Sequence, residues 1–189
     1  GYLLGVVAYA AGRIGREPVR SQGHVHKPSP HNGWSPPELF EIWKGEAIVY
    51  MQESVSDDPG RCYAVRLEAG DSLLCPPAWG HMVINASVSE PMMFGALCDR
   101  NYAGCDYDGV RAHGGLAHFP VVDEYGEIRW QKNGRYESGE LVQKRPERRW
   151  YTEAQEGTGL YAALVDHPEL FRFVPHPEEY PQLWRDFVP

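Results

Sequence analysis

The sequence predicts an all-β domain. Apolar residues make up 42% of the chain, but they occur in short runs that turn residues interrupt. The 20 glycines and 16 prolines are typical of many short strands joined by turns. With 189 residues, the chain is long enough to bury a substantial core, so we expect one domain over residues 1–189. A helical bundle is not expected.

The first hundred residues contain most of the predicted strands. Residues 27–37 interrupt them with four prolines, which disfavour helix and central strand, and this segment is expected to be an exposed loop or lid. The alternation of apolar and polar residues, with glycines at the turns, favours an antiparallel meander over residues 38–75. The expected strands lie at residues 2–10, 38–44, 46–53, 62–68, 71–75, 81–87 and 92–98.

Beyond residue 100 the composition shifts toward glycine, tyrosine and charged residues. Residues 119–133 resemble a two-strand hairpin that turns at Tyr125 and Gly126, and we expect it to pack outside the main strands. A short helix is predicted at residues 158–165. The final segment alternates aromatics with prolines too often for a long helix, so we expect it to wrap across the body.

Charge and apolar content exclude several classes of partner. The formal net charge is −8, and no basic stripe offers the phosphate-neutralising surface that nucleic acid or an anionic membrane needs. The apolar opening is shorter than the roughly 20 residues of a membrane span and is interpreted as a buried strand. Because the chain starts at Gly1 without a methionine, we expect processing or missing upstream residues. A small-molecule partner fits best.

The four cysteines show no close pairing of the CxxC type. A chain of this size does not depend on disulfides for its core. Reduced thiols in a cytoplasmic protein are therefore the expected state.

Three histidines and one glutamate form a candidate metal site. His24 and His26 are two residues apart, so on a strand both side chains point to the same face. Glu38 opens a strand in which alternation places it inward, whereas Glu41 is sent to the opposite face, and a buried carboxylate needs a cation. His81 follows the rigid turn at Pro76 and Pro77. Three histidines and a carboxylate suit Fe, Mn, Ni or Zn and leave coordination positions open.

These residues also resemble a known family. The segments GHVH at 23–26 with Glu38 and Gly45, then Gly70, Pro76, His81 and Asn85, resemble the paired motifs of the cupin superfamily. More narrowly, SQGHVH at 21–26, ELF at 38–40 and PPAWGH at 76–81 resemble the cupin-type glucose-6-phosphate isomerases. The resemblance extends over roughly residues 6–130, including GCDY at 104–107 and DEYGEI at 123–128.

The resemblance implies a fold and an activity. It implies a single cupin domain, which is a double-stranded β-helix or jelly-roll barrel over about residues 2–100, with the hairpin and a short helical C-terminal extension in residues 101–189. It implies interconversion of glucose 6-phosphate and fructose 6-phosphate by a homodimer. It also implies one divalent metal ion per chain, with Fe²⁺ the first choice and Mn²⁺, Ni²⁺ and Zn²⁺ as alternatives.

The same resemblance assigns roles to further residues. Glu38 matches the glutamate at the reacting carbons and is the candidate catalytic base, although a hydride shift is a rival mechanism. Ser21, Gly23 and Tyr107 match substrate-binding positions. Some positions depart from the family pattern: Val7 stands in place of a threonine, Phe40 of a tyrosine, Ala78 of a glycine and Cys105 of a histidine. Arg20 or Tyr102 could supply a replacement phosphate contact.

Two other functions fit the same ligand set. Three histidines and a carboxylate can hold Fe(II) with open positions for oxygen, as in a non-haem cupin dioxygenase. The second alternative is a non-catalytic cupin that binds a sugar phosphate through the metal. Oxygen consumption would favour the first alternative, and tight binding without proton exchange would favour the second.

Overall fold

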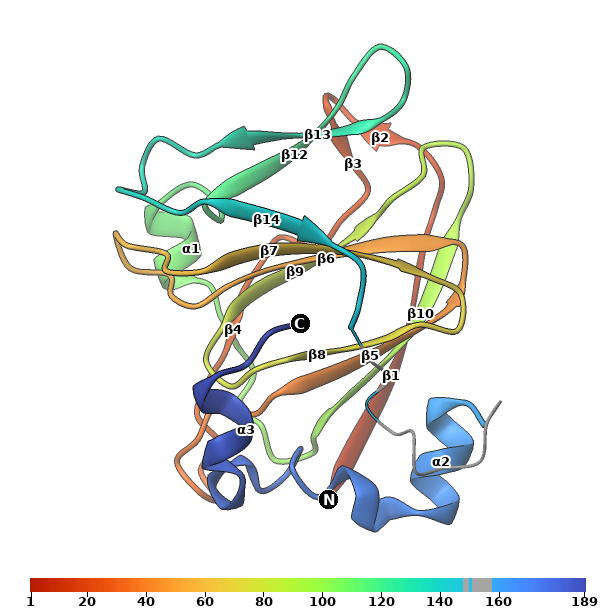
Figure 1. Ribbon diagram of the computed structural model, residues 1–189, viewed down its shortest axis with the longest axis vertical. Helices are drawn as coiled ribbons and strands as arrows, with labels where there is room; N and C mark the ends of the chain where they lie inside the picture. The colour runs from red at the N-terminus through yellow and green to blue at the C-terminus, as the bar shows by residue number, and fades with distance from the viewer. Residues whose placement is uncertain (148–149, 151–157) are drawn as a thin grey trace.

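The computed structural model describes residues 1–147, 150 and 158–189 (Figure 1). The strands are β1 (Tyr2–Tyr9), β2 (Arg13–Ile14), β3 (Glu17–Pro18), β4 (Val25–His26), β5 (Glu38–Lys44), β6 (Glu46–Gln52), β7 (Cys62–Glu68), β8 (Ser72–Cys75), β9 (Gly80–Asn85), β10 (Met92–Asp99), β11 (Cys105–Asp106), β12 (His118–Val122), β13 (Ile128–Lys132) and β14 (Leu141–Lys144). The helices are α1 (Asp108–Ala112), α2 (Leu160–Asp166) and α3 (Pro181–Arg185), with 3₁₀ turns η1 (Pro168–Phe171) and η2 (Pro177–Glu179).

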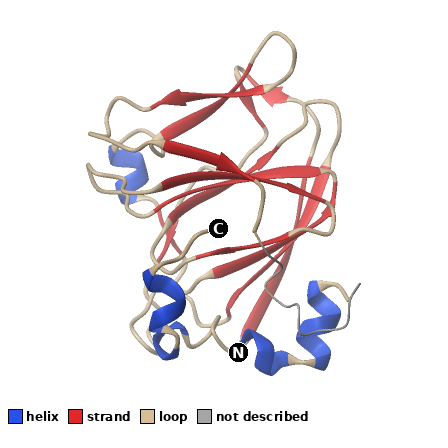
Figure 2. Cartoon of the chain, viewed as in Figure 1, coloured by secondary structure: helices blue, strands red, loops and turns tan. Residues whose placement is uncertain are grey.

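Two four-stranded sheets form the body of the molecule. One sheet has the order β1-β10-β5-β8 and the other β14-β7-β6-β9. Strands dominate the cartoon, and the helices lie at its margins (Figure 2). The all-β prediction is confirmed.

The predicted meander over residues 38–75 is wrong except for one hairpin. β6 and β7 are neighbours, but β5 pairs with β8 and β10 in the opposite sheet. The chain changes sheet between β5 and β6, again between β7 and β8, and then at each of the next two connections. This alternation is the jelly-roll arrangement of the cupin fold, as the motifs led us to expect. A local apolar pattern identifies strands but not their partners.

The core lies between the two sheets and is continued by the C-terminal segment. Inward side chains such as Ile42, Val49 and Leu73 are fully buried. A second, smaller apolar cluster lies on the other face of the β6 sheet, where Trp130 of the hairpin stacks near Tyr50 at a centroid distance of 5.5 Å. The hairpin of β12 and β13 therefore covers the outside of the sheet, as predicted.

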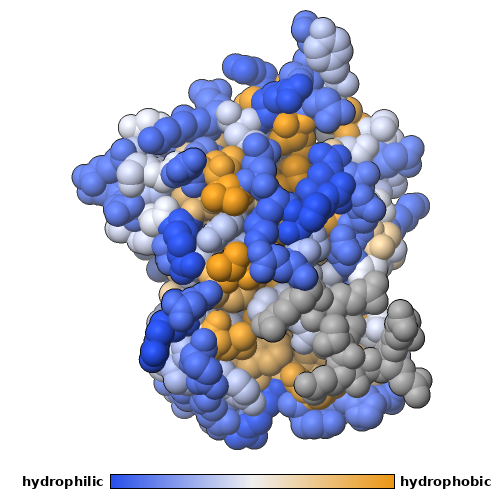
Figure 3. Space-filling view, viewed as in Figure 1, coloured by the Kyte–Doolittle hydropathy of each residue, from blue (hydrophilic) through white to orange (hydrophobic). Residues whose placement is uncertain are grey.

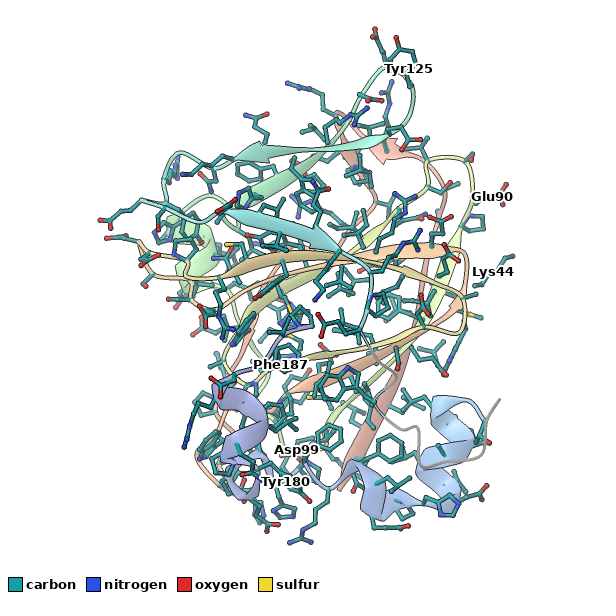
Figure 4. All side chains as sticks on the ribbon, in the orientation of Figure 1. Lys44, Glu90, Asp99, Tyr125, Tyr180 and Phe187 are labelled. Atoms are coloured by element: carbon teal, nitrogen blue, oxygen red, sulfur yellow. The ribbon has the colours of Figure 1, made fainter. Side chains whose placement is uncertain are left out.

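The turn of this hairpin is also where the sequence predicts it. Gly126 has φ of +84° between β12 and β13, and Tyr125 at the tip is 80% exposed (Figure 4).

Phe187, near the C-terminal end of the chain, is buried against Trp79 and Trp150.

β14 is a strand that the sequence analysis did not find. It runs parallel to β7 at the edge of its sheet, with Leu141 opposite Cys62 and Lys144 opposite Val65. Its four residues include only two apolar ones, so no local pattern marks it. One sheet of the body thus takes a strand from the part of the chain beyond residue 100.

The C-terminal extension packs over the outer face of the β5 sheet. α2 begins two residues after the predicted start of the helix at 158, and Leu160 and Ala163 are fully buried. Phe171 and Val174 join the main core, so the tail does wrap across the body. Residues 148–149 and 151–157, which also belong to the predicted extension, lie outside the described residues.

The surface visible in Figure 3 is mainly polar, and the cysteines are not paired with one another. The face seen in Figure 3 is mainly hydrophilic, and its apolar groups are interrupted by polar side chains. All four cysteines are free thiols. None of the helices in the described ranges has the length and apolar character needed to cross a membrane.

Gly45 forms the corner at which the chain passes from β5 to β6. Its φ is +74°, and a Cβ there would lie 2.7 Å from the Pro91 carbonyl oxygen, an atom of the backbone. We predict that Gly45→Ala lowers the free energy of unfolding by about 2–3 kcal/mol, because left-handed strain and a clash add together. Urea denaturation measures this.

Gly15→Ala is the matched control. Gly15 also has a positive φ, of +62°, but no atom lies within 4 Å of the position that an alanine methyl group would take. Gly15→Ala should lower the free energy of unfolding by only about 1 kcal/mol, which is the cost of the backbone conformation alone. Equal losses at the two positions would show that the close approach at Gly45 does not matter.

Candidate metal centre

Four side chains from three separate segments of the chain converge at one point. His24, His26, Glu38 and His81 each offer a ligand atom, and these atoms all lie within 4.8 Å of one another. The imidazole centroids are 4.5–5.2 Å apart. The structure thus brings together all four residues that the sequence predicts as metal ligands.

Backbone pairing places the first and last histidines face to face. The His24 amide donates to the His81 carbonyl at 3.1 Å, and the His81 amide donates to the His24 carbonyl at 2.9 Å. This two-way bridge joins the β4 segment to β9. Side chains opposite each other in such a pair project to the same side. Residues 57 positions apart in the chain therefore meet at one point.

Backbone carbonyls orient two of the imidazoles. His26 Nδ1 lies 3.1 Å from the Pro36 carbonyl oxygen, and His81 Nδ1 lies 3.1 Å from the Trp79 carbonyl oxygen. A carbonyl only accepts, so each Nδ1 carries the hydrogen and donates it. The other ring nitrogen, Nε2, then faces Glu38 with a lone pair. Partners of this kind commonly fix metal-binding histidines.

The loop predicted at residues 27–37 is therefore more than an exposed lid. Its first part is largely exposed, but Ser35, Pro36 and Pro37 are buried. The Ser35 hydroxyl accepts from the Ala78 amide at 2.9 Å, which ties the loop to the turn before His81. Ala78 has a φ of +65°, the left-handed conformation that favours glycine, which explains why a glycine is expected at this position of the motif.

Glu38 completes the group from the first position of β5. Its Oε2 lies 3.0 Å from His81 Nε2 and 3.4 Å from His26 Nε2, and the side chain is 15% exposed. Burial would raise the pKa of Glu38, but His26 and His81, which donate to it when they carry a proton on Nε2, outweigh burial and hold that pKa well below its usual value. Glu38 is thus ionised.

Glu41 is a buried carboxylate that accepts its hydrogen bonds from donors of the protein itself. It points to the opposite face of β5, as predicted, and is only 5% exposed. It accepts hydrogen bonds from the Trp43 indole and from the Leu160 amide. Glu38 differs from Glu41, because the described groups that contact its carboxylate are the imidazole nitrogens of His81 and His26.

This arrangement fits a divalent cation. An anionic oxygen and two ring nitrogens with lone pairs face one another, so a positive species must lie among them, either a proton or a metal ion. Without a metal, burial opposes protonation of His26, but its contacts with Cys98 and Glu38 raise its pKa well above the usual value. Burial and the nearby His81 and His26 lower the pKa of His24 to about 3, which keeps its imidazole neutral and able to coordinate.

A second group with metal-binding residue types is less suited to a cation. It consists of His176, Glu178 and Glu179 near η2. Glu179 already pairs with Arg172 through two bonds of 2.7 Å, and Glu178 accepts from the Asn32 amide at 2.8 Å. Its carboxylates are therefore already satisfied by protein groups.

The predicted substrate-binding residues border the site, but they differ in how far contacts within the fold already use them. The Tyr107 ring lies 5.8 Å from the His24 ring. The Ser21 hydroxyl accepts from the Val83 amide at 3.0 Å, so part of its capacity is used inside the fold. Gly23 has a φ of +94°, and a Cβ would come within 3.0 Å of Leu116. Packing alone thus accounts for the glycine, and substrate binding by these three residues stays a prediction.

Other residues that lie near the histidines were not predicted as metal ligands. Tyr102 packs against His26 at 5.4 Å between ring centroids, and Cys98 Sγ lies 3.7 Å from His26 Nδ1. Cys105 is directly opposite His26 in the β4–β11 pair. The carbonyls of Pro36 and Trp79 could not have been found from residue types, because every residue has a carbonyl.

Comparison with known proteins assigns the family. A family model described as glucose-6-phosphate isomerase (GPI) matches residues 1–138, which include all four candidate ligands. The chain belongs to the glucose-6-phosphate isomerase family. The family resemblance noted in the ligand motifs is therefore confirmed.

Curated members of this family are similar to the chain at modest identity. A putative glucose-6-phosphate isomerase 1 of Rhizobium meliloti (strain 1021) is 27% identical over 66% of this chain and 53% of its own length. A glucose-6-phosphate isomerase of Sinorhizobium medicae (strain WSM419) is 26% identical over 69% of this chain and 55% of its own length. The chain spans about half the length of these relatives.

Solved structures with partial similarity include an oxalate oxidase and an oxalate decarboxylase. The oxalate oxidase is 18% identical, with a TM-score of 0.40, over 51% of this chain and 41% of its own. The oxalate decarboxylase, from Bacillus subtilis, is 19% identical, with a TM-score of 0.42, over 56% of this chain and 23% of its own. Similarity at this level contributes nothing to the functional assignment.

The geometry predicts one metal ion per chain that depends on His81. We expect His81→Ala to lower the affinity for Mn²⁺ or Zn²⁺ at least about a hundredfold, because it removes an oriented ligand. Isothermal titration of metal-stripped protein measures the change. His167→Ala, at a half-exposed histidine on the C-terminal side, should bind as the wild type does. Full-strength, one-to-one binding by His81→Ala would disprove the assignment.

Proposed function

We propose that the protein is a metal-dependent isomerase that interconverts glucose 6-phosphate and fructose 6-phosphate. Family membership supports the reaction. The observation that carries the mechanism is the convergence of Glu38 with two imidazoles whose Nε2 atoms face it. Because the chain spans about half of its curated relatives, the activity rests on these residues and not on the relatives' names.

Each ligand residue has a defined part in this proposal. His24, His26 and His81 would hold the ion, and Pro36 and Trp79 would keep two of the imidazoles in the coordinating tautomer. When bound, the divalent ion supplies Lewis-acid stabilisation to the sugar oxygens that gain negative charge. Glu38 removes the proton from C2 of the open-chain aldose and returns it at C1, while the hydroxyl proton on O2 passes to O1, so that the carbonyl moves from C1 to C2 and the aldose becomes the ketose.

The environment of Glu38 suits a base. Its carboxylate is ionised and so can accept a proton, and its 15% exposure leaves an approach for a substrate. Tyr102 and Tyr107 flank His26 and His24, where aromatic rings would exclude water from a bound sugar. A hydride shift between the two carbons is the competing route and would need no base at this position.

The remaining features of the proposal rest on the family resemblance. We assign Fe²⁺ as the resident ion, with Mn²⁺, Ni²⁺ or Zn²⁺ able to occupy the same nitrogen and oxygen ligands. We assign a second copy of the chain as its partner, forming a homodimer. The four free thiols support a reducing compartment, namely the cytoplasm.

A coupled assay tests the function and the base together. Metal-stripped protein reloaded with Fe²⁺, Mn²⁺, Ni²⁺ or Zn²⁺ should convert fructose 6-phosphate to glucose 6-phosphate with at least one ion. Glu38→Gln, compared at metal saturation, should lower turnover and the exchange of deuterium at C2 at least about a hundredfold, the usual contribution of a general base. Product formation and NMR-detected exchange provide the two readouts.

Glu46→Gln is the matched control. Glu46 is a surface carboxylate at the start of β6 that pairs with Arg66, so its loss removes the same charge far from the imidazoles. It should retain full activity. If Glu38→Gln turned over at an undiminished rate, Glu38 would not be the general base, and the hydride shift would be favoured. No turnover with any of the four ions, or oxygen consumption in its place, would disprove the isomerase.

A further inference from the structure

The loop that joins β4 to β5 is held from two sides. Its buried end contacts the metal centre, because the Pro36 carbonyl accepts from His26 Nδ1 at 3.1 Å. Its exposed part lies beside the C-terminal extension near α3 (Figure 1). There Asn32 Nδ2 donates to the Pro175 carbonyl at 3.1 Å and to Glu178 Oε2 at 2.8 Å. One side chain therefore joins this loop to a segment 143 positions further along the chain.

The amide of Asn32 uses both of its N–H groups and its oxygen. The oxygen accepts from the Trp34 amide at 3.0 Å, which shapes the turn within the loop. The two N–H groups reach out to the extension. An asparagine side chain has two donors and one carbonyl oxygen to offer. The local turn needs only the oxygen, so the two outward bonds indicate a role beyond shaping it.

The chain between Asn32 and Pro36 is stiff. The Ser29 amide donates to the Trp34 carbonyl at 2.8 Å, and Ser29 itself is only 1% exposed, so the turn is closed at a buried point. Ser35 comes next, before Pro36, and a proline fixes its own φ and restricts the residue that precedes it. Few backbone torsions are therefore left to absorb a displacement of Asn32 before it reaches the Pro36 carbonyl.

The C-terminal extension provides the fixed point for this contact. Phe171 and Val174 are fully buried in the main core just before Pro175. The Trp184 indole donates to the Pro177 carbonyl at 2.8 Å, which ties α3 to η2. The family model matches residues 1–138, so the extension lies outside that match. Asn32 thus connects the matched part of the chain to a segment beyond it.

We propose that Asn32 is a positioning residue for the metal centre and that it acts through Pro36 on His26. With the Asn32 bonds in place, the loop keeps the Pro36 carbonyl at His26 Nδ1, and the ring directs its Nε2 lone pair toward the ion. Without these bonds, the loop loses its fixed point on the extension, and the ring is less often oriented for coordination. The inference rests on the proposed metal-dependent function, but its test does not require turnover.

Calorimetric titration of Mn²⁺ into metal-stripped protein measures the effect. We expect Asn32→Ala to weaken Mn²⁺ binding about five- to tenfold, because one hydrogen-bonded restraint on His26 is lost while all four ligands remain.

Asn133→Ala is the matched control. Asn133 also accepts from the amide two positions later and donates to two acceptors, the carbonyls of His113 and Leu116. It follows β13, in the hairpin that covers the outside of the β6 sheet. Asn133→Ala should lower the free energy of unfolding but leave the Mn²⁺ affinity unchanged.

A pair of exchanged substitutions tests the bond between positions 32 and 178. Asn32→Asp keeps the oxygen that accepts from the Trp34 amide, but it places a carboxylate against that of Glu178, so it should bind Mn²⁺ as weakly as Asn32→Ala. Glu178→Gln keeps an acceptor for Asn32 and should bind as the wild type does. In the double variant the new amide donates to the new carboxylate, so most of the affinity should return. A double variant that binds no more tightly than Asn32→Asp would overturn the proposal.

The imidazole hydrogens of isotope-labelled, Zn²⁺-loaded protein report on each ring by NMR. The Nδ1 hydrogen of His26 should exchange with water about fivefold faster in Asn32→Ala, the effect of losing about one hydrogen bond. The Nδ1 hydrogen of His81, which is bonded to the Trp79 carbonyl outside this loop, should exchange at the wild-type rate. Unchanged exchange at His26, or equal acceleration at both rings, would contradict a role of Asn32 that is specific to His26.

The affinity measurements have two further results that would overturn the positioning role. One is equal Mn²⁺ affinity of wild type and Asn32→Ala. The other is an equal loss in Asn133→Ala, which would reveal a general effect of lower stability. If Asn32→Ala behaves as expected but the metal-loaded wild type does not convert fructose 6-phosphate, the isomerase proposal fails while the role of Asn32 stands.

Discussion

The contact between Glu38 and the Nε2 atoms of His26 and His81 is the constraint on which the site depends. The Pro36 and Trp79 carbonyls take the Nδ1 hydrogens, so both rings turn a lone pair toward an ionised carboxylate. Such a group is stable only around a cation. Glu41, equally part of β5, needs none because indole and amide donors reach it.

The jelly-roll order makes this contact possible. The chain alternates between sheets after β5, and β9 therefore returns beside the β4 segment, where His81 and His24 exchange backbone hydrogen bonds. The loop at residues 27–37 closes the arrangement, because its buried end carries both Pro36 and Ser35. Backbone atoms of extended loops and strands thus orient the candidate ligands, while Tyr102 and Tyr107 flank His26 and His24.

Strand alternation and motif spacing were enough to predict the all-β class and the four candidate ligands that the structure brings together. The pairing of β5 with β8 and β10 was not predictable from local pattern, since apolar alternation says which face is buried and not which strand lies beside it. β14 was missed because only two of its four residues are apolar, so no local pattern marks it as a strand. Carbonyl partners such as those of Pro36 and Trp79 have no sequence signal at all, because every residue has a carbonyl.

The location of a bound ion tests the account most directly. Crystals of Mn²⁺-loaded protein, measured at the manganese absorption edge, should show one anomalous peak per chain, within coordination distance of His24, His26, Glu38 and His81. The His81→Ala protein under the same conditions should lack that peak. A peak elsewhere, such as at His176 and Glu178, with none among the four residues would contradict the central claim.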